Sequence, residues 1–265
     1  MHQDSIRLES RQFSEVVQFN VLGKPGYILA PSAVDVPGPF QLSAAWVPPK
    51  LSFSSESWTT GSPDGTMLYH FGVSLTDFLL INLNVTRGIG RDDIGIGDRH
   101  LDVRLRIFKE RKNRPALALH VSPPGPTTNY LAHNALVATK FFDLGKRNTL
   151  LETTAGYGFP YYFGGLNAFT DDKLEIRSKR EEGLWYLNGF FGAVSIHPVN
   201  WASVAVEITN RTVAAALTFR LKNRITGQFN WIGEAGFGFS VQGNIRLDRE
   251  APELRQRRFK ALKKR

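Results

Sequence analysis

The feature that most constrains the fold is a two-residue alternation of apolar and polar side chains that runs from Phe40 to Leu247. The segment 100–107 is the clearest case, because every second residue from Leu101 onward is apolar and the residues between are polar. On a strand these two sets form opposite faces, whereas on a helix they would be scattered around the axis. The alternation therefore predicts an all-β fold.

The same pattern divides this region into about twelve strands. Their predicted ranges are 40–47, 66–74, 78–85, 99–108, 116–122, 134–142, 148–157, 184–196, 201–208, 211–221, 227–235 and 237–247. Connections after even-numbered strands are short, and those after the first, third, fifth and seventh are longer. This arrangement is typical of a closed antiparallel transmembrane β-barrel in the bacterial outer membrane. An even number of strands would place both termini on the short-turn, periplasmic side.

The chain divides into three predicted parts. Residues 1–38 contain Gly and Pro at a density that breaks regular structure, and we expect an N-terminal extension there. Residues 39–247 form the barrel, and residues 248–265 form a basic tail. The first five residues lack the basic and apolar regions of a signal peptide, so we expect a processed chain with an added or retained Met.

Composition excludes several classes of protein. The chain has no cysteine, which rules out disulfides, thiolate metal sites and a cysteine nucleophile. No run of 18 apolar residues is present, so no transmembrane helix is expected.

The main alternative is a soluble β-sandwich or a lipocalin-like barrel, since soluble sheets also alternate. The alternation here covers almost the whole chain, and Arg104, Arg106 and Arg220 on the polar faces could not lie unpaired in a dry core. Aromatic residues near strand ends also suit the interface girdles of a membrane barrel. These residues are Trp46, Tyr69, Tyr157, Trp185, Tyr186, Trp201 and Trp231.

Three segments carry a resemblance to a known family. Residues 23–33 (GKPGYILAPSA) resemble the entry motif of the YjbH-type exopolysaccharide proteins. Residues 97–106, followed by 115–119, and residues 136–142 are similar to later segments of that family, in the same order. The resemblance covers about residues 20–160. It implies a non-enzymatic outer-membrane barrel involved in the export or anchoring of an envelope polymer, with polysaccharide as the expected polymer.

Two other functions remain open. His120, Ser122 and Asn134 have the order of the base, nucleophile and orienting residue of outer-membrane phospholipase A, so a lipolytic enzyme is one alternative. The alternation points His120 and Ser122 into the lumen, whereas that lipase family carries its site on the lipid-facing side. The other alternative is a structural barrel that docks a surface or periplasmic complex. We expect no cofactor, no metal site and no nucleic-acid partner.

The alternation also predicts which residues line the lumen. The candidates are Asn82, Asn84, His100, Asp102, Arg104, Arg106, His120, Lys140, Glu152, Glu207, Arg220, Glu234, Gln242 and Arg246. Their charges nearly balance, which favours a salt-bridged or partly filled interior over a strongly anion-selective pore.

The tail carries five of the nine net positive charges of the chain. Its Arg255, Arg257, Arg258 and Lys260 are candidate contacts to anionic lipid headgroups or to an acidic protein surface.

Overall fold

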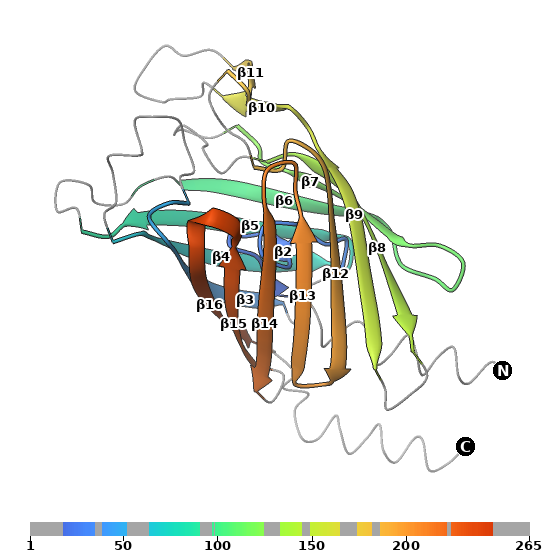
Figure 1. Cartoon of the computed structure of the whole chain (residues 1–265). Coiled ribbons are helices and arrows are strands. Elements are labelled where there is room, and N and C mark those ends of the chain that lie inside the picture. Colours follow the sequence, from blue (N-terminus) through green and yellow to red (C-terminus); the bar gives the residue numbers. More distant parts are fainter. Residues whose placement is uncertain are drawn as a thin grey trace, which may run out of the picture.

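A computed structural model describes residues 18–34, 39–51, 64–90, 97, 99–124, 133–144, 149–164, 174–181, 186–221 and 224–245. Twelve antiparallel strands form a closed barrel in the order β12-β13-β14-β15-β16-β3-β4-β5-β6-β7-β8-β9 (Figure 1). Because the sheet closes on itself, no barrel strand is left with an unpaired edge.

The predicted barrel is confirmed. Its strands are β3 (Phe40–Val47), β4 (Thr66–Thr76), β5 (Leu79–Gly88), β6 (Arg99–Phe108), β7 (Ala116–Val121), β8 (Ala135–Asp143), β9 (Leu150–Gly158), β12 (Gly189–Val199), β13 (Ala202–Ile208), β14 (Val213–Leu221), β15 (Ile225–Ile232) and β16 (Gly236–Ile245). Two short hairpins lie outside this sheet, one of β1 (Gln18–Phe19) with β2 (Pro25–Gly26) and one of β10 (Tyr161–Gly164) with β11 (Glu175–Ser178).

The two ends of the barrel differ. The end that contains the β4–β5, β6–β7, β8–β9, β12–β13 and β14–β15 connections is called the turn end here, and the opposite end is called the loop end. Phe40 at the start of β3 pairs with Ile245 at the end of β16, so the chain enters and leaves the barrel at the turn end. At the loop end, the β9–β12 connection carries the β10–β11 hairpin.

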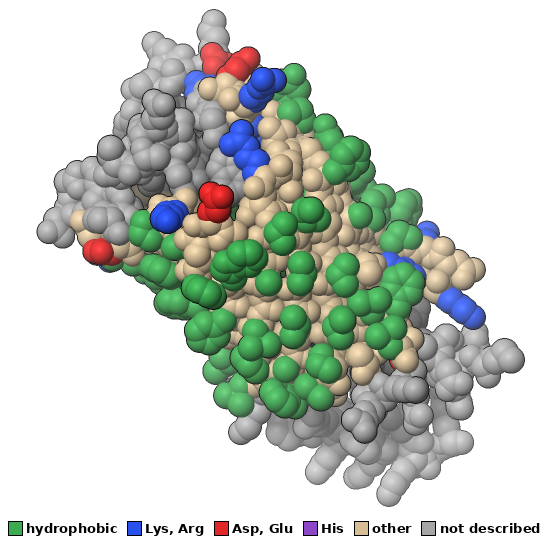
Figure 2. Space-filling view, in the orientation of Figure 1, with side chains coloured by type: hydrophobic (Ala, Val, Ile, Leu, Met, Phe, Trp, Pro, Cys, Tyr) green, Lys and Arg blue, Asp and Glu red, His purple; other side chains and the backbone are tan. Residues whose placement is uncertain are grey.

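The outward face is apolar over the whole barrel. Outward side chains such as Val206, Phe229 and Val241 are about half exposed or more, while their inward neighbours are buried. Figure 2 shows hydrophobic side chains spread over the visible outer face. A monomeric soluble protein rarely exposes a continuous apolar surface of this extent, and the surface suits a membrane barrel. Among the described residues, no helix is long and apolar enough to cross a membrane.

Two predicted positions beside glycines of positive φ are wrong. The eighth predicted strand began at 184, but β12 begins at Gly189, which has a φ of 93° and separates it from the preceding chain. Tyr186 therefore lies buried against His133, and not in an outer girdle. Glu234, predicted to line the lumen, lies exposed in the 3-10 turn Gly233–Ala235 between β15 and β16. Gly233 and Gly236 both have positive φ there, which ends the strand alternation.

Candidate functional site: a lumen filled by the N-terminal segment

Residues 18–34 fold inside the barrel, and all of them are buried. This segment is called the plug. Figure 1 shows it within the ring of strands. The sequence pattern predicted an extension leading into the sheet, and it gave no indication that this part of the extension fills the lumen.

The plug is held in shape by Asn20. Its side-chain oxygen accepts hydrogen bonds from the backbone N–H groups of Leu22 (3.0 Å) and Lys24 (2.9 Å), and its amide nitrogen donates to the Leu29 carbonyl (2.8 Å). Gly23, at φ 74°, lies so close to the wall that a Cβ there would come within 1.8 Å of Asn84 Oδ1. Only glycine fits both this backbone conformation and this contact.

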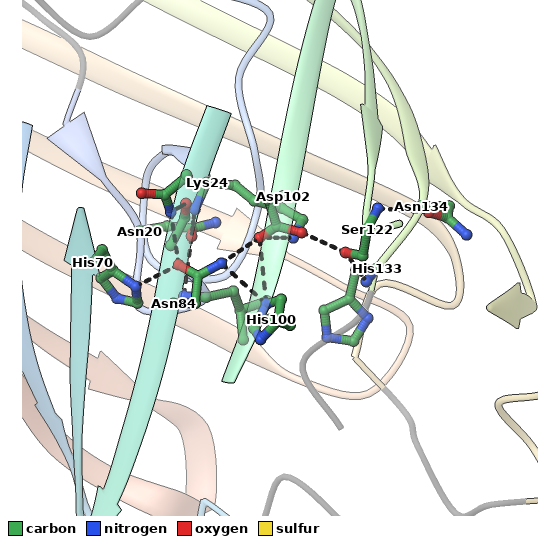
Figure 3. Close-up of polar contacts among 12 residues, drawn as sticks. Asn20, Lys24, His70, Asn84, His100, Asp102, Ser122, His133 and Asn134 are labelled. Atoms are coloured by element: carbon green, nitrogen blue, oxygen red, sulfur yellow. Dashed lines mark hydrogen bonds and ion pairs between the residues drawn. The ribbon is translucent and has the colours of Figure 1, made fainter. Parts of the chain in front are cut away.

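A buried ion pair joins the plug to β6. Lys24 Nζ lies 2.6 Å from Asp102 Oδ2, and the two side chains are 0% and 6% exposed (Figure 3). Asp102 also accepts a hydrogen bond from the amide of Asn84 (2.7 Å) and lies 3.4 Å from His100 Nε2. Each carboxylate oxygen is thereby engaged, since the Ser122 hydroxyl donates to Oδ1. Such complete partnering is what a buried carboxylate requires.

A second buried carboxylate binds the plug backbone from the far wall. Glu207 on β13 accepts three consecutive backbone N–H groups, from Ile28 (3.1 Å), Leu29 (2.7 Å) and Ala30 (3.0 Å). Consecutive N–H groups that converge on one anion form a backbone nest. The plug is thus fixed to both sides of the lumen by charged groups.

Further contacts from side chains of the wall complete the attachment. Arg104 and His120 donate to the plug carbonyls of Ala33 (3.5 Å) and Ser32 (3.1 Å). On β8, Thr139 lies 3.1 Å from the Ser32 hydroxyl and accepts the N–H of Ala33 (2.9 Å). A chain with this many buried polar contacts is packed into the lumen as part of the fold.

The structure brings together most of the residues predicted to line the lumen. Those buried inside the barrel are Asn82, Asn84, His100, Asp102, Arg104, His120, Glu152, Glu207 and Gln242. Arg106 and Arg220 lie apart from this group, near the turn end. The prediction for Lys140 is wrong, because Thr139 and Phe141 on either side of it turn their buried side chains inward, so Lys140 lies on the outward face of β8. Lys140 forms an ion pair with Glu110 (3.0 Å), and Arg220 donates to the Asn200 carbonyl (3.3 Å). Arg246 and the four tail residues lie outside the described residues.

The candidate lipase residues have other partners. His120 Nε2 contacts the Ser32 carbonyl, whereas the Ser122 hydroxyl donates to Asp102 and accepts the N–H of His133 (2.9 Å). Asn134 accepts the N–H of Ser122 (2.9 Å). Ser122 is fully buried, and the serine and His120 lie on the lumen side as the alternation predicted.

Sequence reasoning missed several buried groups: Lys24, His70, His133 and Lys179. Lys179 donates to the Leu187 carbonyl (3.0 Å), and burial, together with the charge of Lys24, lowers its pKa to about 7. The one sequence feature that could have indicated a buried role for Lys24 was its position within the Gly- and Pro-rich residues 23–26. Among the described residues, no group of three His, Asp or Glu side chains is arranged to hold a metal ion.

Comparison of the sequence with models of known protein families finds no match, and comparison with curated proteins finds none. The chain is thus characterised by its architecture, a closed antiparallel barrel of twelve strands whose outward apolar residues suit a membrane.

Proposed function

We propose that this protein is a non-enzymatic outer-membrane barrel that takes part in the export or anchoring of an envelope polymer, and that the polymer is a polysaccharide. The observation that carries the proposal is a membrane-type barrel whose lumen is filled by its own N-terminal segment. A barrel that exports or anchors a polymer needs its lumen closed at rest, because an open barrel of twelve strands would let small solutes leak across the membrane.

The polysaccharide is supported by the YjbH-type resemblance and by where its segments lie. Residues 23–33 form most of the plug, residues 97–106 lie mainly on β6, and residues 136–142 lie on β8. Lys24 contacts Asp102, Ala33 contacts Arg104, and Ser32 contacts Thr139. Segments that are separate in the sequence therefore meet at one place in the lumen, as parts of a single functional unit would.

The test is a deletion of the gene in its host, with measurement of the polymer retained on the cell surface and released into the medium. We expect the distribution to change, and expect the wild-type gene to restore it. An unchanged distribution in the deletion strain would contradict the proposal. Purified protein should release no fatty acid from phospholipid vesicles; release that is lost in Ser122→Ala would favour the lipolytic enzyme instead.

The filled lumen also favours a second candidate, a barrel that docks a protein complex. In this role both termini would face the periplasm, and the basic residues Arg255, Arg257, Arg258 and Lys260 would bind an acidic protein surface or anionic lipid. Pull-downs with the full chain and with a chain lacking 250–265 would test this at low and high salt. Equal recovery of partners by both forms would exclude a binding role for the tail.

A further inference from the structure

The connection between β6 and β7 carries a concentrated positive charge at the turn end. Four of the six residues 109–114 are Lys or Arg, and the one acidic residue among them is Glu110. These six residues are called the basic turn. Its shape is defined by the backbone, because the N–H of Arg111 donates to the Arg114 carbonyl (3.0 Å) and the N–H of Arg114 donates to the Arg111 carbonyl (3.2 Å). The side chains of Arg111 and Lys112 at its tip are exposed.

Carboxylates neutralise only part of this charge. Glu110 is buried and forms an ion pair with Lys140 of β8, at 3.0 Å between Oε1 and Nζ. Asp77 forms an ion pair with Lys109, at 2.7 Å between Oδ2 and Nζ. Among the residues that the structure describes, no carboxylate pairs with the other three cations of the basic turn. These cations are therefore available to an anion from outside the chain.

The basic turn leans over the outward face of β8. Lys140 projects from that face, and its Nζ donates hydrogen bonds to the backbone carbonyls of Arg111 and of Lys112, the latter at 3.1 Å. Figure 1 shows the β6–β7 connection projecting beyond the ring of strands. The contacts to Lys140 thus place the cations of the turn on the membrane side of the wall, and not over the mouth of the lumen.

Exposed apolar side chains lie next to these cations. Phe108 at the end of β6 and Phe142 on the outward face of β8 are each 45% exposed. The Arg114 guanidinium lies over the Phe108 ring, 4.9 Å from its centroid. Figure 2 shows Lys and Arg side chains beside hydrophobic ones at the right edge of the visible face. Cations directly beside outward aromatic rings are typical of the boundary between the apolar interior of a membrane and its headgroups.

We propose that Arg111, Lys112 and Arg114 bind the anionic headgroup of a phospholipid in the membrane leaflet at the turn end. Phosphate oxygens accept charge-assisted hydrogen bonds from guanidinium and ammonium groups, and basic residues at a membrane surface attract anionic lipids. The acyl chains of the same lipid would cover Phe108 and Phe142, which an acidic protein surface would leave exposed. The inference goes beyond the proposed function, since it concerns the lipid around the barrel and not the polymer.

The experiment measures the association of spin-labelled lipids with the full chain in phosphatidylcholine bilayers, by electron spin resonance. The two probes have the same acyl chains and differ in headgroup, one being anionic phosphatidylglycerol and the other zwitterionic phosphatidylcholine. We expect phosphatidylglycerol to associate about fivefold more strongly, the factor that one Lys or Arg near an anionic headgroup contributes. Arg111→Gln combined with Lys112→Gln should remove most of this preference.

This double variant should fold as well as the wild type, as checked by its heat-dependent gel mobility. The two side chains are exposed, and the hydrogen bonds from Lys140 go to backbone carbonyls that the substitutions leave in place. The matched control is Arg180→Gln combined with Arg211→Gln, which removes two exposed charges at the loop end and should leave the preference unchanged. An equal loss of preference in both double variants would overturn the inference, because it would show an effect of net charge alone.

Two further outcomes would also contradict the lipid site. Equal association of the two lipids with the wild type would overturn it and leave an acidic protein surface as the partner of the basic turn. Sodium phosphate and sodium chloride at equal ionic strength should weaken the preference equally, through screening. A larger effect of phosphate would show that the turn binds free phosphate, and would overturn the assignment to lipid.

Discussion

Two ion pairs between lysine and aspartate lie in opposite surroundings in this protein. Lys24 and Asp102 are both buried, and 2.6 Å separates Nζ from Oδ2. Lys109 and Asp77 have side chains that are 58% and 80% exposed, with a similar Nζ–Oδ2 distance of 2.7 Å. Asp102→Asn leaves the Lys24 charge buried without its counter-charge, which typically costs about 3–5 kcal/mol. We expect faster amide hydrogen exchange throughout residues 18–34.

Asp77→Asn is the matched control. Water screens this exposed pair, so its loss should leave exchange in the plug unchanged. Equal exchange in the two variants would show that the buried pair does not hold the plug.

The buried Lys179 predicts that the free energy of unfolding depends on pH. Burial lowers its pKa from 10.5 to about 7, so between these pH values the unfolded chain binds a proton that the folded chain does not. The free energy of unfolding should therefore rise with pH from about 7 to 10, by up to about 1.4 kcal/mol per pH unit from this group. Urea unfolding at several pH values measures this slope, and Lys179→Met should flatten it. A slope unaffected by the substitution would contradict the assignment.

At the level of residues, most of the wall could be predicted and the plug could not. A strand turns every second side chain inward, so the facing of Asp102, Arg104 and Glu207 followed from local sequence alone. Their hydrogen-bond partners in the plug could not be predicted in this way. Lys24 is 78 residues from Asp102, and Ile28 is 179 residues from Glu207. Contacts over such separations form only when the barrel closes around the plug. The local alternation of apolar and polar residues does not specify them.

At the level of strands, the outward face makes a depth-dependent prediction. Leu83 lies in the middle of β5 and is 41% exposed, while Leu75 lies near the turn end of β4 and is 57% exposed. In a bilayer, Leu83→Arg places a charge near the midplane and should cost about 2–4 kcal/mol, whereas Leu75→Arg near the interface should cost about 0–1 kcal/mol. Unfolding in phospholipid vesicles compares the two variants. Equal costs would argue against a membrane around this face.

Strand positions were predicted well where the alternation was uninterrupted, and less well beside glycines of positive φ. β3 and β6 match their predicted limits, and neither strand contains a glycine. The start of β12 and the end of β15 were misplaced, because Gly189, Gly233 and Gly236 turn the chain at sites that composition alone does not reveal.

For the molecule as a whole, we expect the plug to decide whether the barrel conducts ions. Glu207→Gln replaces a carboxylate that accepts three backbone N–H groups by an amide whose own N–H₂ group faces those donors. The plug should loosen, and we expect a higher ionic conductance of the barrel in planar bilayers than for the wild type. Unchanged conductance would mean that Glu207 does not hold the lumen closed.

A reversible cross-link can distinguish whether higher conductance comes from movement of the plug or from a general loss of structure. Ser32 Oγ and Thr139 Oγ1 lie 3.1 Å apart, so Ser32→Cys with Thr139→Cys places two thiols where the hydroxyls now touch. Since the chain has no other cysteine, this pair can form only the intended bond within one molecule, and Ser32→Cys alone is the control. Added to Glu207→Gln, the pair should lower conductance to the wild-type level when oxidised and restore the high level on reduction. In the oxidised form the cross-link holds the plug against β8, and the remaining wall is unchanged. Conductance that stays high in this form would therefore show that ions pass through the barrel with the plug in place.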